Sequence, residues 1–414
     1  MRYCTESDIV SVLENLEAAT PRIVVSGNFA TPWELVRIVG ENLSSVRFFA
    51  LNPQLGFPDR DGVTIESPFL GPAGRRNERC DYIPMRLSLA PRLFSTTRPP
   101  DAVFLHTSTP VDGKVSLSLE TNILPAAIEE ARRRGAPIIA QVNANLPYTF
   151  GDSEIDVEHI DYAFSADTAL ASPNERPPDD AANAIGERIA GIAVDGTTLQ
   201  MGIGMLPDAA LGHLTKRRHL GVWTEMLSDG VMHLERAGAL DETRPIVASF
   251  LFGSPELYQW LDRNPRLIMR RTETTNDPGL IAKQPAMLSI NTALQVDLYA
   301  QANASFVRGR TYSGFGGQPD FVSGALHSPG GNSVIALRSW HDKSDTSSIV
   351  PLLSEPTCSF QHSAIVTENG LATIFGRTQR EQAHLIIERA AHPSAREALW
   401  AAAEERGLGH RPRH

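Results

Sequence analysis

Residues 22–35, RIVVSGNFATPWEL, contain the pattern on which the predicted fold rests. The β-branched run Arg22–Ser26 predicts a short strand that passes through a glycine turn into a helix. Thr31 is a favourable N-cap, Pro32 suits the first helical position, and Glu34 would complete a capping box. A strand, a glycine turn and a helix form the repeating unit of α/β proteins.

The same alternation continues through the first half of the chain. Buried strands are predicted at Val46–Ala50, Ala102–His106 and Pro137–Val142. Between the last two, a helix is expected to open near Pro125 and to end at Gly135. A Glu129–Arg133 pair, one turn apart, would support this helix. Consecutive strands joined by a helix lie parallel, so the predicted fold class is α/β with a mostly parallel sheet.

A second unit follows the most linker-like stretch of the chain. Ser172–Asp180, SPNERPPDD, combines three prolines with alternating charges, and we predict a domain boundary at about residue 180. A helix with isoleucines at helical spacing and a strand at Thr197–Met201 come next. Residues 199–211, LQMGIGMLPDAAL, repeat the order of strand, glycine, proline and helix. This favours two related domains, 1–180 and 181–414, although such turns are common in α/β proteins.

Composition excludes several classes of protein. The 414 residues are 42% hydrophobic and 21% charged, which is typical of a globular protein with more than one core. The net charge of −10 gives no basic footprint for nucleic acid. Acidic residues interrupt the first 20 positions, and no apolar run approaches a membrane span, so we expect neither a signal peptide nor a membrane protein. Three separated cysteines (Cys4, Cys80 and Cys358) form no CxxC pair and favour a reducing, cytoplasmic location.

Several signatures of other enzymes are missing from the sequence. It has no GxxxxGK[ST] phosphate loop, no GxSxG elbow and no HExxH helix. The histidines stand at no spacing that a metal requires, so we predict no metal site, and His106 is expected to be a core histidine. Gly202 and Gly204 lack the third glycine of a dinucleotide fingerprint. They predict either a tight turn between a strand and a helix or an anion-binding turn.

Two other stretches carry more chemistry. Leu220–Glu225, LGVWTE, is an apolar strand that ends in an acid, with a turn signal at Asp229–Gly230. Ligands bind beyond the carboxyl ends of parallel strands, so Glu225 is a candidate base, nucleophile or metal ligand, or else a helix-capping or surface glutamate. Residues 313–321, SGFGGQPDF, have three glycines in four positions, which allows backbone N–H groups to approach a phosphate or an oxyanion. The alternative there is a β-bulge or hairpin.

These motifs together resemble the acetyl-CoA hydrolase/transferase family of class I CoA-transferases, particularly its shorter members, the 4-hydroxybutyrate and butyryl-CoA:acetate CoA-transferases. The similar motifs of the first half are GNFATPW (27–33), CDYIPMRLS (80–88) and VNANLPYTFGDSEIDVEHIDY (142–162). Those of the second half are LQMGIGMLPDAAL (199–211), TEMLSDG (224–230), NDPGLIAKQ (276–284), SINTALQVDLYAQANA (289–304), SGFGGQPDF (313–321) and AIVTENGLA (364–372). This many motifs in one order is highly specific for the family.

The resemblance implies two similar open, mostly parallel α/β domains with the active site between them. It implies a glutamate nucleophile, here Glu225, that forms an acyl-glutamyl anhydride and then a glutamyl-CoA thioester. We expect the N–H groups of Gly316 and Gly317 to hold the oxyanion, and Asn276 to orient the acyl carbonyl. The residues expected to contact coenzyme A are Gln200, Met201, Gly202, Ile203, Gly204 and Gln318. Coenzyme A would be a substrate and not a tightly bound cofactor, and the protein a homodimer or higher homo-oligomer.

The chain departs from the family pattern at two places. Tyr148 stands where the family has an arginine, and Phe150 where it often has a histidine. The loop at 340–348, before the Ile-Val-Pro strand, lacks most of the usual lysines and arginines. We therefore expect an acyl group other than a simple short fatty acid. An acyl-CoA hydrolase with the same site is the nearest alternative, and a catalytically silent CoA-binding homologue is a further one.

Overall fold

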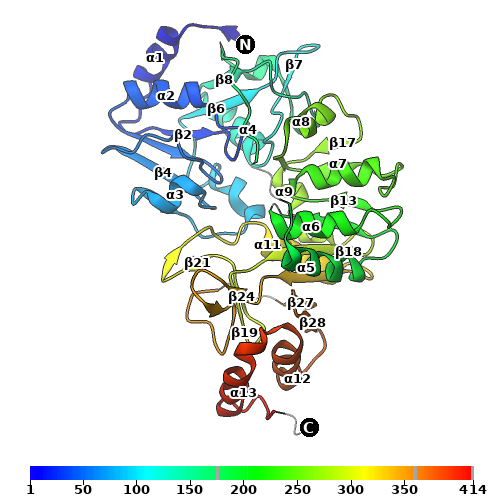
Figure 1. Ribbon diagram of the computed structural model, residues 1–414. Coiled ribbons are helices and arrows are strands. Elements are labelled where there is room, and N and C mark those ends of the chain that lie inside the picture. Colours follow the sequence, from blue (N-terminus) through cyan, green and yellow to red (C-terminus); the bar gives the residue numbers. More distant parts are fainter. Residues whose placement is uncertain (174–176, 203, 358–360, 412–414) are drawn as a thin grey trace.

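The chain forms two large sheets, one built mainly from each half (Figure 1). The computed structural model describes residues 1–414 except 174–176, 203, 358–360 and 412–414. The predicted α/β class with mostly parallel sheets is confirmed. The predicted boundary near residue 180 falls between the last strand of the first sheet, β11 (Tyr162–Ser165), and helix α5 (Asp180–Ile192).

The first sheet has eight strands, and every neighbouring pair is parallel. In spatial order these are β1 (Arg2–Tyr3), β11, β8 (Ile138–Val142), β6 (Ala102–Thr107), β2 (Arg22–Val25), β3 (Val46–Phe49), β4 (Val63–Ser67) and β5 (Cys80–Tyr82). Successive residues of β2 face opposite sides of the sheet. Ile23 and Val25 pack toward α1 (Glu6–Glu14) and α2 (Trp33–Asn42). Val24 packs toward α4 (Leu124–Arg134). Both faces are therefore covered by helices, as parallel sheets require.

The second sheet has nine strands, and only β27–β28 is antiparallel. The spatial order is β28 (Gly370–Thr373), β27 (Ala364–Thr367), β23 (Asn332–Ala336), β18 (Met287–Thr292), β12 (Thr198–Met201), β13 (Gly221–Trp223), β15 (Ile246–Ala248), β17 (Leu267–Met269) and β9 (Phe150–Gly151). One face packs on α5, α6 (Met205–His213), α7 (Asp229–Arg236) and α8 (Pro255–Leu261). The other face packs on α10 (Pro278–Ile281) and α11 (Gln318–His327).

Strand β9 links the two halves. It belongs to the first half of the chain, yet it is the edge strand of the second sheet, where Ile268 of β17 pairs with Phe150. Gly151, at φ +96°, has no room for a side chain, because a Cβ would lie 2.4 Å from the Met269 carbonyl oxygen. The aromatic rings of Phe29 and Phe252 also stack across the halves, with centroids 3.4 Å apart. The two sheets are therefore joined by backbone and side-chain contacts.

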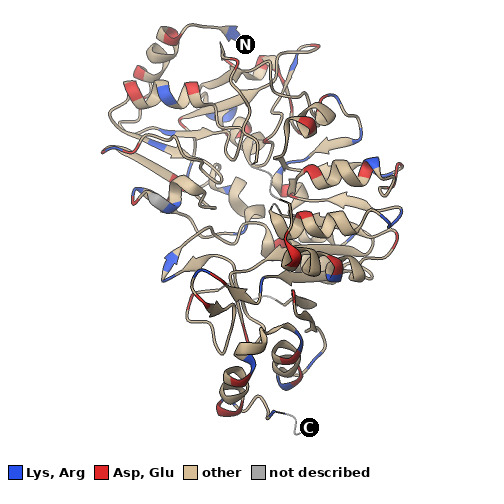
Figure 2. Ribbon diagram, in the orientation of Figure 1, with Lys and Arg blue, Asp and Glu red and all other residues tan. Residues whose placement is uncertain are grey.

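A smaller C-terminal layer lies beyond the second sheet (Figure 1). Its apolar core joins the three-stranded sheet β20 (Ala302–Asn303), β19 (Gln295–Asp297) and β26 (Ile349–Val350) to α12 (Gln379–Leu385) and α13 (Arg396–Glu405). Charged residues of both signs are distributed over the outer helices (Figure 2). Within the described residues, no helix combines the length and the hydropathy needed to span a bilayer.

Three local predictions were wrong. Helix α2 has no capping box, because the Thr31 hydroxyl turns back to the Asn28 carbonyl, while Gln141 caps the Glu34 N–H across 3.1 Å. The Glu129–Arg133 pair does not form.

Instead, Arg133 binds Glu130 on the preceding turn, and Glu129 pairs with Arg271 of the second half. The turn predicted at Asp229–Gly230 is instead the first turn of helix α7. In the first two cases a partner distant in sequence replaced the local one.

Candidate active site

The backbone at Glu225 is fixed at the carboxyl end of β13. Glu225 lies between β13 and the short strand β14 (Met226–Leu227). Its carbonyl accepts hydrogen bonds from the N–H groups of Ser249 and Phe250, each 2.9 Å long. Two bonds to one carbonyl leave little freedom for this residue, so its side chain leaves the sheet edge in a defined direction.

The Glu225 side chain is held by an asparagine from the connection that follows β17. Asn276 follows α9 (Thr272–Thr275) and donates from Nδ2 to Oε2 of Glu225 across 2.7 Å. The Thr275 hydroxyl donates to Asn276 Oδ1 at 2.8 Å. Because Oδ1 is occupied by a donor, the amide must present its N–H to the carboxylate. Asn276 is fully buried, which makes this orientation costly to change.

The glycine-rich segment at residues 313–317, the glycine loop, lies against the same carboxylate. A Cβ built on Gly317 would lie 1.8 Å from Oε2 of Glu225 and 2.3 Å from Nδ2 of Asn276. Gly316 has φ +52°, in the left-handed region that favours glycine. Among the described residues, neither N–H donates to a protein acceptor. Two backbone N–H groups without protein acceptors therefore lie beside the carboxylate, an arrangement suited to holding an oxyanion.

Contacts from the first half hold this loop in place. The Leu70 N–H donates to the Ser313 carbonyl at 2.5 Å, and the Leu87 N–H to the Gly316 carbonyl at 3.0 Å. Ser88 donates from its N–H and its hydroxyl to the Asp320 carboxylate, at 3.2 and 2.9 Å. The loop geometry thus depends on both halves of the chain.

The environment of Glu225 disfavours its charge. The pKa of Glu225 is raised to about 7, mainly by burial and also by the nearby Asp320, and the Asn276 hydrogen bond opposes both effects. Burial also raises the pKa of Asp320 to about 6, against the lowering effect of its bonds to Ser88. A carboxylate of this pKa is ionised in part at neutral pH and is poorly solvated, which makes it a better nucleophile than a surface glutamate.

A cavity of about 420 Å³ lies between the two halves, with Glu225 in its wall. Of the residues expected to contact coenzyme A or the acyl group, the lining includes Gln200, Met201, Gly202, Gly316, Gly317 and Gln318. Gly204 begins α6 at φ +116° and is not in the lining. Asn276 lies behind Glu225, and Ile203 lies outside the described residues. Most of the predicted residues therefore share one cavity.

The cavity wall from the first half was not predicted. It includes Asn28, Asn52 and Asn122, each with a positive φ, and Arg75, the single lysine or arginine among the described lining residues. Arg75 donates to the Tyr312 carbonyl at 2.6 Å, and its guanidinium lies 3.9 Å over the Tyr312 ring. The asparagines follow strands or turns of the first sheet, as expected for ligand-binding positions. Asn28 lies in the motif GNFATPW, but its position in the cavity wall, like that of Asn52 and Asn122, depends on tertiary contacts that the sequence does not show.

The departures from the family pattern lie elsewhere. Tyr148 donates to Glu154 at 3.1 Å and packs edge-on against Phe150, and neither is in the cavity lining. Residues 340–348 include an exposed hairpin of β24 (Trp340–His341) and β25 (Thr346–Ser347), which is likewise outside the lining. These substitutions therefore lie outside the cavity lining.

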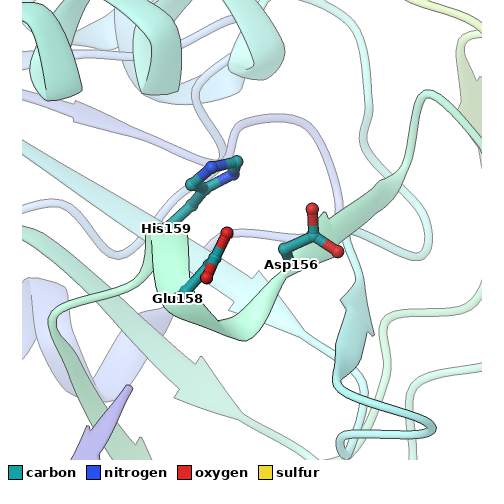
Figure 3. A group of neighbouring side chains, drawn as sticks. All are labelled: Asp156, Glu158 and His159. Atoms are coloured by element: carbon teal, nitrogen blue, oxygen red, sulfur yellow. The ribbon is translucent and has the colours of Figure 1, made fainter.

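His106 is a buried histidine, as predicted. Its Nε2 lies 3.1 Å from the amide nitrogen of Asn143, and burial lowers its pKa to about 4. One group of described residues has metal-ligand side chains close together: the exposed Glu158 and the half-buried Asp156 and His159 (Figure 3). Such surface groups are common without an ion, and we assign no metal to it.

Comparisons with known proteins agree with this geometry. Residues 253–403 match the family model described as the acetyl-CoA hydrolase/transferase C-terminal domain. The 4-hydroxybutyrate coenzyme A transferase of Clostridium kluyveri is 38% identical, over 78% of this chain and 76% of that protein. The succinyl-CoA:acetate/propanoyl-CoA:succinate CoA transferase of Fasciola hepatica is 34% identical, over 93% and 84%.

Solved structures share the whole architecture. RipA from Yersinia pestis superposes with a TM-score of 0.91 at 27% identity, covering 99% of this chain and 98% of the other. The 4-hydroxybutyrate CoA-transferase of Porphyromonas gingivalis gives 0.79 at 29% identity, covering 98% of each chain.

Proposed function

Since the chain belongs to the acetyl-CoA hydrolase/transferase family, a family of acyl-CoA enzymes, we propose that it transfers CoA between an acyl-CoA and a carboxylic acid through covalent intermediates on Glu225. The observation that carries the proposal is the close packing of Asn276 and Gly317 around one oxygen of that carboxylate. A glutamate held this tightly, with a raised pKa and free backbone donors beside it, is suited to nucleophilic catalysis.

The proposed reaction divides one exchange into balanced steps. A Glu225 oxygen attacks the thioester carbonyl carbon, the C–S bond breaks, and an acyl-glutamyl anhydride and CoA thiolate result. The thiolate attacks the glutamyl carbonyl carbon, the donor acid leaves as its carboxylate, and a glutamyl-CoA thioester remains. The acceptor carboxylate then repeats both steps in reverse. No outside oxidant or proton source is required.

The residues around Glu225 support each step. The N–H groups of Gly316 and Gly317 would hold the oxyanion of each tetrahedral intermediate, and loss of one such donor typically costs about 3–4 kcal/mol. Asn276 would hold the carboxylate in the attacking orientation. Water in place of the acceptor acid would give hydrolysis, the activity for which some relatives are named.

Coenzyme A would bind as a substrate along the second half of the cavity. Gln200, Met201, Gly202 and Gln318 line that part and would contact the pantetheine arm. Arg75, fixed on Tyr312, is the cation available in the described lining for an anionic group. In a chain of net charge −10, one positioned guanidinium is a meaningful local counter-charge.

Trapping of the covalent intermediate tests the proposal. The protein is incubated with acyl-CoA, reduced with borohydride and digested, and modified peptides are identified by mass spectrometry. We expect a reduced Glu225 and its absence in Glu225→Gln, which is nearly isosteric but a far poorer nucleophile. A labelled acceptor acid then separates transfer from hydrolysis. No adduct across a broad acyl-CoA panel, or full turnover by Glu225→Gln, would refute the proposal.

A panel of donors tests the expected acyl preference. Acetyl-, butyryl- and 4-hydroxybutyryl-CoA are compared at equal concentration. We expect at least one of these short acyl groups to be a poor substrate. Rapid turnover of all three would contradict the expectation that the natural acyl group is not a simple short fatty acid.

A further inference from the structure

Glu120 is a buried carboxyl next to the active site with no cationic partner. It is 1% exposed, and no ion pair to it occurs among the described residues. Its Oε2 accepts from Asn28 Nδ2 at 2.6 Å, and its Oε1 accepts from Asn122 Nδ2 at 3.2 Å. Both asparagines line the cavity that contains Glu225, whereas Glu120 lies behind them.

The two asparagines are also fixed from their other ends. Asn52 donates from Nδ2 to Asn28 Oδ1 at 2.9 Å, and the Thr272 hydroxyl donates to Asn122 Oδ1 at 2.7 Å. The four hydrogen bonds of this network all run in one sense: Asn52 and Thr272 donate to the two asparagines, and the asparagines donate to Glu120. Each cavity asparagine therefore keeps one N–H and one oxygen lone pair for a ligand.

The backbone joins this network to the nucleophile. The Asn122 N–H donates to the Ser249 carbonyl, and the Ser249 N–H donates to the Glu225 carbonyl. Asn28 and Asn122 have φ of +46° and +40°, conformations that cost energy outside glycine and recur at ligand sites. Asn28 and Asn122, the polar wall of the cavity, therefore have strained backbone, and Asn122 is linked to Glu225 through Ser249.

We infer that Glu120 is a positioning residue that fixes the Asn28 and Asn122 amides as a polar wall of the acyl site, and that this wall selects acyl groups carrying a second hydrogen-bonding function, such as a hydroxyl, carbonyl or carboxyl. The inference rests on the proposed function. A plain alkyl chain would leave the remaining N–H and oxygen lone pair of each asparagine side chain without a partner, which is unfavourable for a buried polar group. That penalty is sufficient for strong discrimination, since a site built for a polar group rejects analogues that lack it.

Glutamine at position 120 gives a clean test. Glutamine matches glutamate in volume but replaces one acceptor oxygen by an NH2 group, whereas both oxygens of Glu120 accept from asparagine N–H groups. The new NH2 group would face one of these N–H groups. That asparagine must then rotate and give up its bond to Asn52 or Thr272. Glu120→Gln therefore changes hydrogen-bond direction with little change of volume.

The experiment measures kcat/KM for 4-hydroxybutyryl-CoA and butyryl-CoA, which differ by one hydroxyl. We expect the wild type to favour the hydroxylated donor at least 10-fold and Glu120→Gln to bring the ratio close to 1, mainly by loss on the polar donor. Thr272→Val, which removes one outer hydrogen bond, should lower the ratio in part and serves if Glu120→Gln fails to fold. The matched control is Glu66→Gln, which removes a buried carboxylate paired with Arg22 outside the cavity and should leave the ratio unchanged.

Adduct formation separates this inference from the proposed function. If the wild type forms the Glu225 adduct but shows no preference for the polar donor, or if Glu120→Gln and Thr272→Val both keep the wild-type ratio, the polar wall is refuted and the transferase proposal stands. If no donor labels Glu225, the proposed function itself has failed.

Discussion

Asn276 donates a hydrogen bond of 2.7 Å to Oε2 of Glu225, and it does so from a fully buried position behind the cavity wall. The two residues are 51 positions apart in sequence and follow β13 and β17, two strands of the second sheet that have β15 between them. The bond favours the ionised glutamate, whereas burial and Asp320 favour the neutral one. The chemistry of the site therefore depends on a balance that substitutions can shift in either direction.

Removal of the Asn276 amide should shift the acidic limb of the pH–activity profile to higher pH. The carboxylate is the reactive form, so activity rises with pH through the pKa of Glu225, about 7. Asn276→Ala loses the contact that lowers this pKa, and we expect the limb at higher pH and kcat about 10- to 100-fold lower, since a hydrogen bond to a charged group contributes about 1.5–3 kcal/mol. The measurement is kcat/KM from pH 5 to 9. Asn369→Ala, which loses an amide bonded to Ser339 away from the cavity, is the control, and a limb that stays in place in Asn276→Ala contradicts the assigned role.

Neutralisation of Asp320 should shift the same limb in the opposite direction. Its negative charge raises the pKa of Glu225, so Asp320→Asn should lower that pKa and extend activity to more acidic pH. The asparagine keeps an oxygen that can accept from Ser88. The pH profile is compared with that of Asn276→Ala. Shifts of the same sign in both variants would show that the charges around Glu225 do not control its ionisation.

Gly317 should tolerate no side chain. A methyl group there would overlap Oε2 of Glu225, to which its carbon would lie 1.8 Å away. We expect Gly317→Ala to lower kcat at least 100-fold, because the carboxylate or the oxyanion donors must move, and such donors contribute about 3–4 kcal/mol. Gly191→Ala is the matched control, since this glycine lies in α5 with open space around it and alanine favours helices by about 1 kcal/mol. Near-normal turnover by Gly317→Ala would mean that the loop does not approach the reacting carboxylate.

The buried carboxyls should make the folded protein less stable as the pH rises. The pKa of Glu225 is raised to about 7 and that of Glu120 to about 8, so between about pH 4.5 and 8 the folded state binds more protons than the unfolded state. By linkage, these groups lower the free energy of unfolding as pH increases through that window. Glu225→Gln removes one of them, so its denaturant midpoint should exceed that of the wild type at pH 8, with a smaller difference at pH 5. Equal pH dependence in both proteins would contradict the raised pKa.

The regular parts of the fold could be predicted because they depend on local patterns. The strand at Arg22–Val25 and the helix ending at Gly135, which has φ +71°, follow β-branched runs and a glycine cap. Errors arose where a distant residue replaced a local partner, as when Arg271 took Glu129 away from Arg133. Such exchanges depend on tertiary contacts, which sequence spacing does not encode.

The site was predicted only in part, because some of its residues lie in local motifs and others depend on tertiary contacts. Glu225 and the glycine loop belong to compact motifs, and the structure brings them into contact. Asn28 and Asn122 belong to the other half of the chain, and their role depends on the side chain of Glu120 behind them. A buried acid in the run SLSLETN was a usable signal, because an acid rarely follows an apolar strand into the interior without a specific partner.

The edge strand β9 has a consequence for dissection of the molecule. Residues 181–414 expressed alone would lack Phe150 and Gly151 and would leave β17 with unpaired backbone groups along one side. An exposed strand of this kind is a template for association between copies. A cut at the predicted boundary would therefore yield an aggregation-prone fragment. A fragment that begins before β9 would keep the strand that pairs with β17 and covers that edge.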